Sequence, residues 1–395
     1  MAKRRANHEG SIFKTKHGTW RAQITIQGKR LSKNFDTQRE CQDWLRKTRD
    51  KIEAGLTYEY SQKIYGDFLN NWMLSTKSTL THNTWSHYNQ IVGDYIIPEL
   101  GKIKLVDLKP EHIQALYEKK LREGKGPRLV QYIHAIIRKS LNHALKLGVI
   151  NRNPALATNP PKRHQKEMSI LMENQVQALI IAGQHQDHPY IRIYQLAIST
   201  GMRQGEILGL QWKDIDWERM TIHIRRQLRN VYGGGLEFAP PKSKAGIRKV
   251  KVGTQVMGIM EEQKLRVAKM AFKNTEKWQD QDLVFPGKTG KPLAHSYVTT
   301  LLQKLLSDAG LPKIRFHDLR HTAASLMLNS GVPVLVVSKR LGHAKPSITL
   351  DVYGHLISSM QEFAAEVMDQ FITPNEIPTA PQLPLTIDSQ DLDKK

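Results

Sequence analysis

The spacing of hydrophobic and polar residues changes several times along the chain, and each change marks a different predicted structure. Residues 8–36 alternate in short β-prone runs with turn dipeptides at His17-Gly18 and Gln27-Gly28, which predicts three short strands. A helix is predicted from about Thr37 to Ala54, because apolar residues recur there at helical spacing. Its apolar face holds Cys41, Trp44, Leu45 and Ile52. Residues 1–58 are therefore predicted to form a small domain with a three-stranded sheet and one helix.

Residues 59–160 place apolar residues three and four positions apart, which is the period of an α-helix. Four segments show this pattern: YGDFLNNWMLS, THNTWSHYNQIVGDYIIPEL, KPEHIQALYEKKLREG and RLVQYIHAIIRKSLNHALKLG. Four helices without strands predict an all-α domain. The last helix is predicted to end at Gly148, since glycine is common just after helix C-termini. A proline-rich, basic linker follows, so we place a domain boundary near residues 155–168.

Residues 169–372 combine helical patterns with a group of short strands, MTIHIRRQLR, LEFAPPKSK and IRKVKV. This pattern predicts a mixed, mainly α-helical domain with a small antiparallel sheet. Residues 373–395 are rich in proline and polar residues, and we expect this tail to be disordered. The predicted fold class is an α+β multidomain protein, and the sequence contains no internal repeat.

The charge of the chain indicates a polyanionic partner. Its 59 lysines and arginines exceed its 37 acidic residues and give a net charge of +22. Nucleic acid is favoured, because each lysine or arginine placed against a phosphate releases condensed counterions. A solvated basic surface and an anionic membrane surface are the alternatives. The single cysteine excludes an internal disulfide, and no apolar run approaches the roughly 20 residues of a membrane span, so we expect a cytoplasmic, soluble protein.

Basic residues are concentrated in the predicted N-terminal sheet. They are Lys14, Lys16, Arg21, Lys29, Arg30 and Lys33. We expect them to give the sheet a basic face, and a β-sheet can lie in the major groove of DNA. A solvated basic sheet without a partner is the alternative.

The segment FHDLRHTAASLML, residues 316–328, allows either a metal site or a phosphate site. His317 and His321 have the i, i+4 spacing of a zinc pair. Asp318 nevertheless stands where the catalytic glutamate of that pattern would be, no third ligand is evident, and Arg320 would place a cation beside the metal. The phosphate site is therefore favoured.

Two other segments support a phosphate site. In STGMRQGEILG, Arg203 begins a helix, where backbone N–H groups and a guanidinium can meet the same anion, and Glu206 can brace the arginine. In SKRLGHAKPSITLDVYGHL, His343 lies on a tight turn, and Tyr353 follows on a helix that Pro346 is suited to begin. Taken singly, each of these residues is expected to be structural.

Taken together, the motifs resemble the tyrosine recombinases, and within them the phage and conjugative-element integrases. The likeness rests on TGMRQGE, PPKSKAGIRKV, HDLRH, LGH and VYGH, which occur in the order and at the spacing of the family signature. It covers the whole chain, because a small N-terminal sheet module, a helical domain and a mixed catalytic domain is the architecture of the lambda-type, arm-binding integrases. The resemblance thus implies an arm-type DNA-binding domain over 1–58, a SAM-like core-binding domain over 59–160, a catalytic domain over 169–372 and a tail over 373–395.

The resemblance also implies a catalytic set, and the chemistry of these residue types agrees with it. Breaking a phosphodiester requires positive charge and hydrogen-bond donors at the non-bridging oxygens. Two arginines and an imidazole donor, Arg203, Arg320 and His343, would supply them. Tyr353 would be the nucleophile, and we expect His317 to accept its proton. We leave His321 outside the set as a structural neighbour.

The leaving 5′-oxygen needs a proton, which the resemblance assigns to a lysine on a β-hairpin. Lys242 is the candidate, and Lys244 lies two residues away, so that it could point the same way along a strand.

The implied reaction needs neither metal nor ATP, because the 3′-phosphotyrosyl link conserves the energy of the broken bond. The implied partners are double-stranded DNA with core-type and arm-type sites, three further copies of the chain in a tetramer, and possible accessory proteins, namely a host DNA-bending factor and an excisionase. The apolar stretch after Tyr353 is expected either to dock on a neighbouring subunit or to pack within its own. Two alternative functions remain: a DNA-binding regulator without activity, and a type IB topoisomerase.

Overall fold

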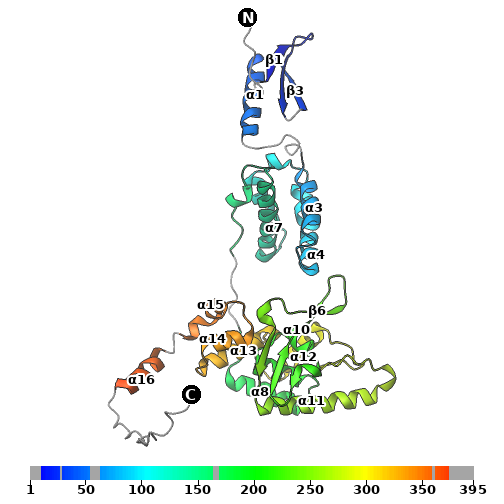
Figure 1. Cartoon of the computed structure of the whole chain (residues 1–395), viewed down its shortest axis with the longest axis vertical. Helices are drawn as coiled ribbons and strands as arrows, with labels where there is room; N and C mark the ends of the chain where they lie inside the picture. The colour runs from blue at the N-terminus through cyan, green and yellow to red at the C-terminus, as the bar shows by residue number, and fades with distance from the viewer. Residues whose placement is uncertain (1–9, 27–28, 54–62, 163–168, 358–360, 373–395) are drawn as a thin grey trace, which may run out of the picture. The chain divides into compact units, whose positions relative to one another are not determined.

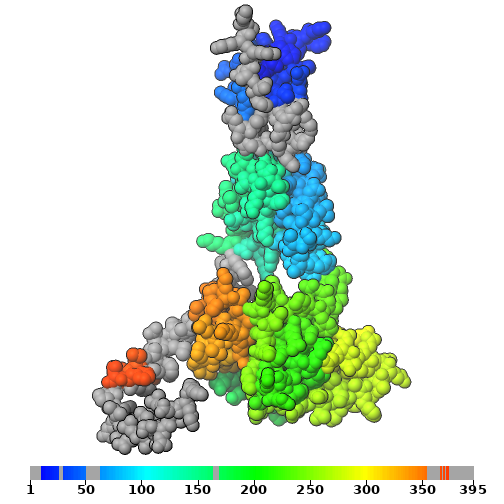
Figure 2. Space-filling model, viewed as in Figure 1, coloured from blue at the N-terminus to red at the C-terminus, as the bar shows by residue number. Residues whose placement is uncertain are grey.

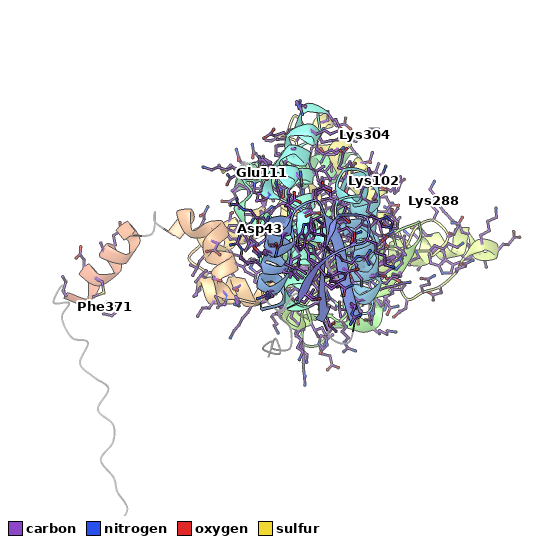
Figure 3. The ribbon with its side chains drawn as sticks, turned by 90° about the horizontal axis from the view of Figure 1, so that it is seen from above. Asp43, Lys102, Glu111, Lys288, Lys304 and Phe371 are labelled. Carbon is purple, nitrogen blue, oxygen red and sulfur yellow. The ribbon has the colours of Figure 1, made fainter. Side chains whose placement is uncertain are left out.

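The computed structural model describes residues 10–26, 29–53, 63–162, 169–357 and 361–372 (Figure 1). The chain forms two compact units, one of residues 1–166 with 231–233 and one of residues 167–230 with 234–395. The predicted turn at Gln27-Gly28 and the tail 373–395 lie outside the described residues. Charged side chains such as those of Lys102, Glu111, Lys288 and Lys304 are exposed on the two units (Figure 3).

The first strands and helix form as the alternating pattern predicts. Three strands pair in the order β1-β2-β3 and are followed by one helix: β1 Ser11–Lys14, β2 Trp20–Ile26, β3 Lys29–Phe35 and α1 Gln38–Glu53. Ala22 and Ile24 on β2 pack against Cys41 and Leu45 on α1, and this cluster is the core of the module. Gly18 has a φ of 82° in the first turn, a conformation that glycine adopts without strain.

The register of this sheet divides the basic residues that we expected on one face. Residues paired across antiparallel strands point to the same side of a sheet. Lys33 pairs with Ala22, and Lys14 pairs with Trp20, so both lie on the side that α1 covers. Arg21 pairs with Asn34 and Arg30 pairs with Thr25 on the open side. The expectation of a single basic face with all six residues is therefore wrong.

The remaining two of the six basic residues are Lys16 and Lys29. Lys16 lies in the turn between β1 and β2, and the side chain of Lys29 falls outside the described part of the chain. Of these six residues, Arg21 and Arg30 are the two that the strand register places on the open side.

The next segment is helical, as predicted. Its helices are α3 Tyr65–Thr76, α4 His82–Ile91, the π-helix Val92–Ile96, α5 Ile97–Leu100, the 3₁₀ turn Leu105–Asp107, α6 Pro110–Arg122, α7 Pro127–Lys146 and the 3₁₀ turn Pro154–Ala157. One hydrophobic cluster joins them, including Tyr65, whose hydroxyl forms a 2.8 Å hydrogen bond with that of Ser140. No helix in the described ranges is long and apolar enough to cross a lipid bilayer.

The second unit contains two small antiparallel sheets. One has the order β4-β5-β8 and the other joins β6 and β7: β4 Ile215–Asp216, β5 Thr221–Ile224, β6 Gln227–Asn230, β7 Leu236–Ala239 and β8 Arg248–Lys251. Lys242 and Lys244 lie between β7 and β8, and Lys244 begins the 3₁₀ turn Lys244–Gly246. The expectation that these lysines lie on a hairpin strand is therefore wrong. Pro240 and Pro241 end β7 before the lysines, because proline cannot donate to a ladder.

Helices form most of the second unit, and Figure 2 shows its green, yellow and orange segments in contact with one another. They are α8 Glu173–His185, α9 Ile191–Thr200, α10 Gln204–Leu208, the 3₁₀ turns Trp212–Asp214 and Thr275–Lys277, α11 Thr254–Lys273, α12 His295–Asp308, α13 Phe316–Asn329, α14 Val334–Leu341, α15 Pro346–Ile357 and α16 Gln361–Ile372. The large core includes Leu196, Ile222, Leu302 and Leu319, and a smaller cluster holds Tyr353. A mainly helical unit with small antiparallel sheets confirms the predicted α+β class.

Candidate active site

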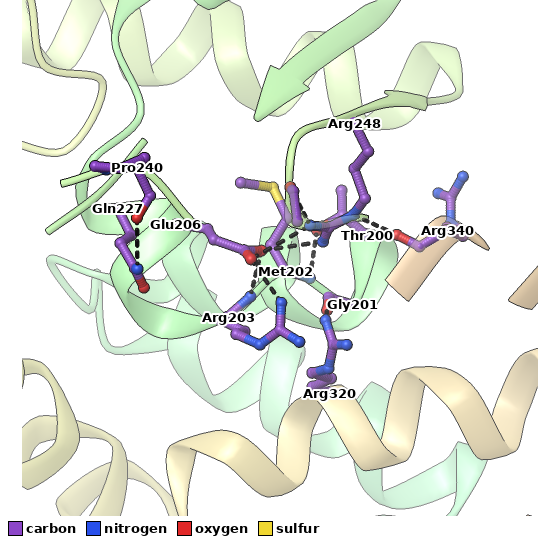
Figure 4. Close-up of polar contacts among 11 residues, drawn as sticks. Thr200, Gly201, Met202, Arg203, Glu206, Gln227, Pro240, Arg248, Arg320 and Arg340 are labelled. Carbon is purple, nitrogen blue, oxygen red and sulfur yellow. Dashed lines mark hydrogen bonds and ion pairs between the residues drawn. The ribbon is translucent and has the colours of Figure 1, made fainter. Parts of the chain in front are cut away.

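Arg203 and Arg320 approach each other through the end of helix α9. Gly201 caps α9 with a φ of 67°, and Arg203 then lies at the N-terminus of α10. The Nη1 of Arg320, on α13, donates a 2.6 Å hydrogen bond to the carbonyl oxygen of Gly201 (Figure 4). Two segments more than 100 residues apart in the sequence thus bring two guanidinium groups to one place.

The side chain of Arg320 is buried and only partly satisfied. It is 3% exposed, and its Nη2 has no hydrogen-bond partner among the described residues. Burial, and then repulsion from Arg203, lower the pKa of Arg320 to about 9. A guanidinium stays protonated at neutral pH, so this shift reflects the cost of holding a cation there without an anion. An anion that accepted the free N–H would remove that cost.

Glu206 orients Arg203 from behind. Its carboxylate accepts hydrogen bonds from the backbone N–H and the Nη1 of Arg203, at 3.0 and 2.8 Å. The Glu206 side chain is 1% exposed, whereas that of Arg203 is 36% exposed, so the arginine reaches outward from a buried anchor. Burial alone would raise the pKa of Glu206, but its ion pairs with Arg248 and Arg203 outweigh burial and lower it.

Arg248 is a second partner of Glu206 and was not anticipated from the sequence. Its Nη2 lies 3.0 Å from a Glu206 oxygen, its Nη1 donates to the carbonyl of Gly246 at 3.0 Å, and its Nε donates to the carbonyl of Arg340 at 2.7 Å (Figure 4). One guanidinium therefore connects Glu206, which anchors Arg203, with the 3₁₀ turn Lys244–Gly246 and with the end of α14. Only a planar fork of several donors can make all these bonds at once.

The turn that carries His343 is packed against Arg248. Gly342 has a φ of 72°, and a Cβ on it would come within 2.8 Å of the carbonyl oxygen of Ala245 and 2.9 Å of Nη1 of Arg248. The turn therefore requires glycine both for its backbone conformation and for this close approach. The Nδ1 of His343 lies 2.8 Å from Oγ1 of the buried Thr349, which fixes the ring.

Both predicted histidines are neutral at physiological pH. Burial, followed by the charges of nearby groups, lowers the pKa of His317 and that of His343 to about 4. Arg203 and Arg320 are among the charges that lower each pKa. The two rings therefore lie in the field of the same two arginines, and each can donate one N–H to an anion without carrying a charge of its own.

Tyr353 is held by His321, the residue that we left outside the predicted set. The Tyr353 hydroxyl lies 2.6 Å from Nδ1 of His321, and its ring is 1% exposed within the small cluster. His317 contacts His321 edge to face, with ring centroids 5.1 Å apart. Burial raises the pKa of Tyr353 to about 12. The only sequence signal for His321 was its i, i+4 spacing from His317, which could not show contact with a tyrosine 32 residues away.

The two candidate acids differ little in their surroundings. Lys242 and Lys244 are both exposed, on either side of Ser243. The assignment of Lys242 as the acid therefore stays a prediction.

Comparison with known proteins relates the chain to one family. Residues 169–359 match the phage integrase family, and residues 64–121 match the N-terminal SAM-like domain of phage integrases. A "Tyrosine recombinase XerC-like" protein of Caldanaerobacter subterraneus subsp. tengcongensis is 26% identical, over 89% of this chain and 96% of its own.

Solved structures share the fold. One is a Tn1549 transposon integrase in complex with a circular intermediate DNA, with a TM-score of 0.66 and 18% identity over 78% of this chain and 100% of that one. Another is a lambda integrase tetramer bound to a Holliday junction, with a TM-score of 0.54 and 16% identity over 88% of this chain and 96% of that one. The match to the phage integrase family and the likeness to a tyrosine recombinase favour a recombinase over a regulator or a topoisomerase. With the five motifs brought together around Arg203, Arg320 and Tyr353, they identify the chain as a tyrosine recombinase of the phage integrase family.

Proposed function

We propose that this recombinase cuts and rejoins double-stranded DNA at attachment sites, and so integrates and excises a phage or another mobile element. The observation that carries the proposal is the buried Arg320, which has an unpaired N–H and lies in the field of Arg203. A phosphate oxygen would provide the missing acceptor and the missing negative charge. The similarity to integrases solved with DNA supports the choice of DNA as the anion.

The scissile phosphate would be held by Arg203, Arg320 and His343. Charge develops on the non-bridging oxygens as the phosphorus is attacked, and donors that are already in place stabilise it without reorganisation. The two arginines, with the neutral His343 as a hydrogen-bond donor, can thereby take the role that a magnesium ion has in many nucleases. Among the described residues, no group of three or more His, Cys, Asp or Glu side chains is placed to hold a metal. We therefore expect cleavage to continue in EDTA, and loss of activity with recovery on adding zinc or magnesium would contradict this.

Tyr353 would attack the phosphate and form a 3′-phosphotyrosyl link, while the 5′-oxygen leaves. With a pKa of about 12, the hydroxyl is protonated at neutral pH and has to lose its proton during attack. His317 is the base predicted from the sequence, and Lys242 is the predicted acid for the leaving oxygen. The link conserves the energy of the broken bond, so a second 5′-hydroxyl can reseal it without a cofactor.

Strand exchange between two duplexes needs four active sites, so we propose a homotetramer on DNA. The lambda integrase tetramer supports this assembly. The apolar stretch after Tyr353 includes α16, whose Met368, Phe371 and Ile372 are exposed and suit docking on a neighbouring subunit. We place the reaction in the cytoplasm of a bacterial host, and a host DNA-bending factor and an excisionase would be its accessory proteins.

Residues 1–58 would bind arm-type sites, and residues 59–160 the core site. The open side of the N-terminal sheet offers Arg21 and Arg30 to DNA, with Lys16 in the adjoining turn. Lys14 and Lys33 lie on the helix side, where the Nζ of Lys33 is 5.3 Å from the centre of the Phe35 ring. These two lysines would contact DNA only at the edges of the sheet.

The test is covalent trapping on DNA. The substrate is a core-site duplex taken from the direct repeat in the DNA that flanks the gene, with a nick beside the scissile phosphate so that religation is prevented. Wild-type protein should form an adduct that survives denaturant, and Tyr353→Phe should bind the duplex with unchanged affinity but form none. An adduct with Tyr353→Phe would show that another residue is the nucleophile.

A further inference from the structure

Within the described part of the chain, the hydroxyl of the proposed nucleophile Tyr353 has one hydrogen-bond partner, His321. The 2.6 Å contact between the Tyr353 hydroxyl and Nδ1 of His321 joins helices α15 and α13. The tyrosine ring cannot turn away easily, because it is packed with Ala324, Val337 and Leu341. The position of the hydroxyl relative to His321 is therefore set by the packing of the two helices.

His321 is in the protonation state that a base requires. Burial, and then repulsion from Arg320 and Arg315, lower its pKa, although Asp318 acts in the opposite direction. A neutral imidazole with its hydrogen on Nε2 accepts the Tyr353 hydroxyl at Nδ1. A separation of 2.6 Å is within the range over which a general base takes a proton directly.

His317 is placed for a different task. Its ring lies edge to face against that of His321, and its pKa is lowered by burial and then by His321, Arg320 and Arg203. These surroundings are those of a group that faces the phosphate rather than the tyrosine. Among the described residues, the hydrogen-bond partner of the Tyr353 hydroxyl is His321.

We propose that His321 is the general base of cleavage and the general acid of religation, an inference that rests on Tyr353 being the nucleophile. In cleavage, the hydroxyl proton moves to Nδ1 of His321 while the Tyr353 oxygen bonds to phosphorus. The bond from phosphorus to the 5′-oxygen breaks, and that oxygen leaves with the electron pair and takes a proton from the lysine. In religation the 5′-hydroxyl returns its proton to the lysine, and the imidazolium of His321 returns its own to the departing phenolate.

The charge that appears on His321 during cleavage has a stabilising neighbour. Asp318, one turn earlier on α13, is 2% exposed and raises the pKa of His321. Its carboxylate is held by Arg315, which donates to it from the backbone N–H at 2.7 Å and from the side chain. Among the described residues, His317, Arg320 and His343 also face this part of the site, and Arg203 acts on both of these histidines.

The variant His321→Asn separates a base from a residue that merely positions the tyrosine. The Oδ1 of asparagine is attached to Cγ, as Nδ1 of histidine is, so it can accept the same hydrogen bond, but it does not bind a proton at neutral pH. We expect His321→Asn and His321→Ala both to form adduct roughly a hundredfold more slowly than wild type, with unchanged DNA affinity. If His321→Asn stays within threefold of wild type, the ring only positions Tyr353 and the proposal fails.

The matched control is His317→Asn, measured on a duplex with sulfur at the bridging 5′ position. Sulfur departs as thiolate and needs no acid, so the rate on this duplex reports the base. For wild type the rate should fall as the pH drops through the pKa of the base, and this fall should persist in His317→Asn and disappear in His321→Asn. The opposite pattern would make His317 the base. Adduct formation by Tyr353→Phe would overturn the proposed function itself. A near-wild-type rate of His321→Asn, or the opposite pH pattern, would overturn only the role of His321.

Discussion

The substitution Glu206→Gln tests whether one buried carboxylate holds the arginines of the site in place. Glu206 is bonded through one oxygen to Nη1 of Arg203 and through the other to Nη2 of Arg248, and its side chain is 1% exposed. Glutamine has nearly the same shape, but it replaces one acceptor oxygen with an NH₂ donor. Whichever way the glutamine amide is turned, its NH₂ group would face an N–H group of Arg203 or of Arg248.

The expected loss of stability follows from burial. Removing one member of a buried ion pair costs about 3–5 kcal/mol, because the partner remains buried without compensation. Two arginines lose their anion here, although Arg203 can turn toward solvent and limit its share. We therefore expect the free energy of unfolding to fall by about 3–5 kcal/mol. At roughly 2–4 °C per kcal/mol for a unit of this size, the melting temperature should fall by roughly 6–20 °C.

The assay is urea unfolding of the full-length protein, with Glu218→Gln as the control. Glu218 is exposed on the same unit, so its variant should stay within about 0.5 kcal/mol of wild type. Because the pKa of Glu206 is lowered in the folded state, its contribution is present above its unfolded pKa and is lost as the pH falls through the folded pKa. The difference between wild type and Glu206→Gln should therefore shrink in acid. A difference below 1 kcal/mol at pH 7, or one that stays constant in acid, would refute the ion-pair account.

Three further predictions concern the lysines, Arg248 and the N-terminal module. Lys242→Ala should cleave ordinary DNA roughly a hundredfold more slowly than wild type, but it should cleave a duplex with bridging 5′ sulfur at nearly the wild-type rate. Rescue by sulfur that is confined to Lys244→Ala would make Lys244 the acid. Lys249→Ala is the control for the loss of one positive charge. Arg248→Lys should lower the rate of adduct formation at least tenfold, because one ammonium cannot replace the fork; an unchanged rate would show that Arg248 does not position the site. Removing residues 1–58 should abolish recombination that depends on arm-type sites while leaving core-site cleavage, and normal recombination by the truncated protein would show that the module does not bind arm sites.

Features that depend on neighbouring residues could be predicted from the sequence. The helix expected over Thr37 to Ala54 is α1, Gln38–Glu53, because apolar spacing is a local signal. The contact of Arg203 with Glu206 could also be predicted from the sequence, since residues three apart on a helix lie on one face. Membership of the phage integrase family could also be predicted, because the motifs of this family are short and lie in a fixed order. The match of residues 169–359 to the family confirms this prediction.

The basic face of the N-terminal sheet was wrong for a reason that the sequence already contained. Side chains alternate between the two sides of a strand, so Lys33 has to share a side with Leu31 and Phe35. Those two residues pack toward α1, and Lys33 lies with them at the edge. Exposure of a charged residue does not place it on the open side of a sheet, because a long side chain can reach solvent from the rim of the covered side.

The contacts that sequence reasoning missed join residues far apart in the chain. Arg248 meets Glu206 across 42 residues, and Tyr353 meets His321 across 32. Each of these four residues has several ordinary roles at its own position, and only packing of the helices and of β8 selects one of them. Motif reasoning named the residues that would touch the phosphate, since the chemistry of phosphate restricts their type. It could not name Arg248 and His321, whose role depends on which other side chain they meet. For this site, the residues that orient and deprotonate the catalytic groups therefore had to come from the folded structure.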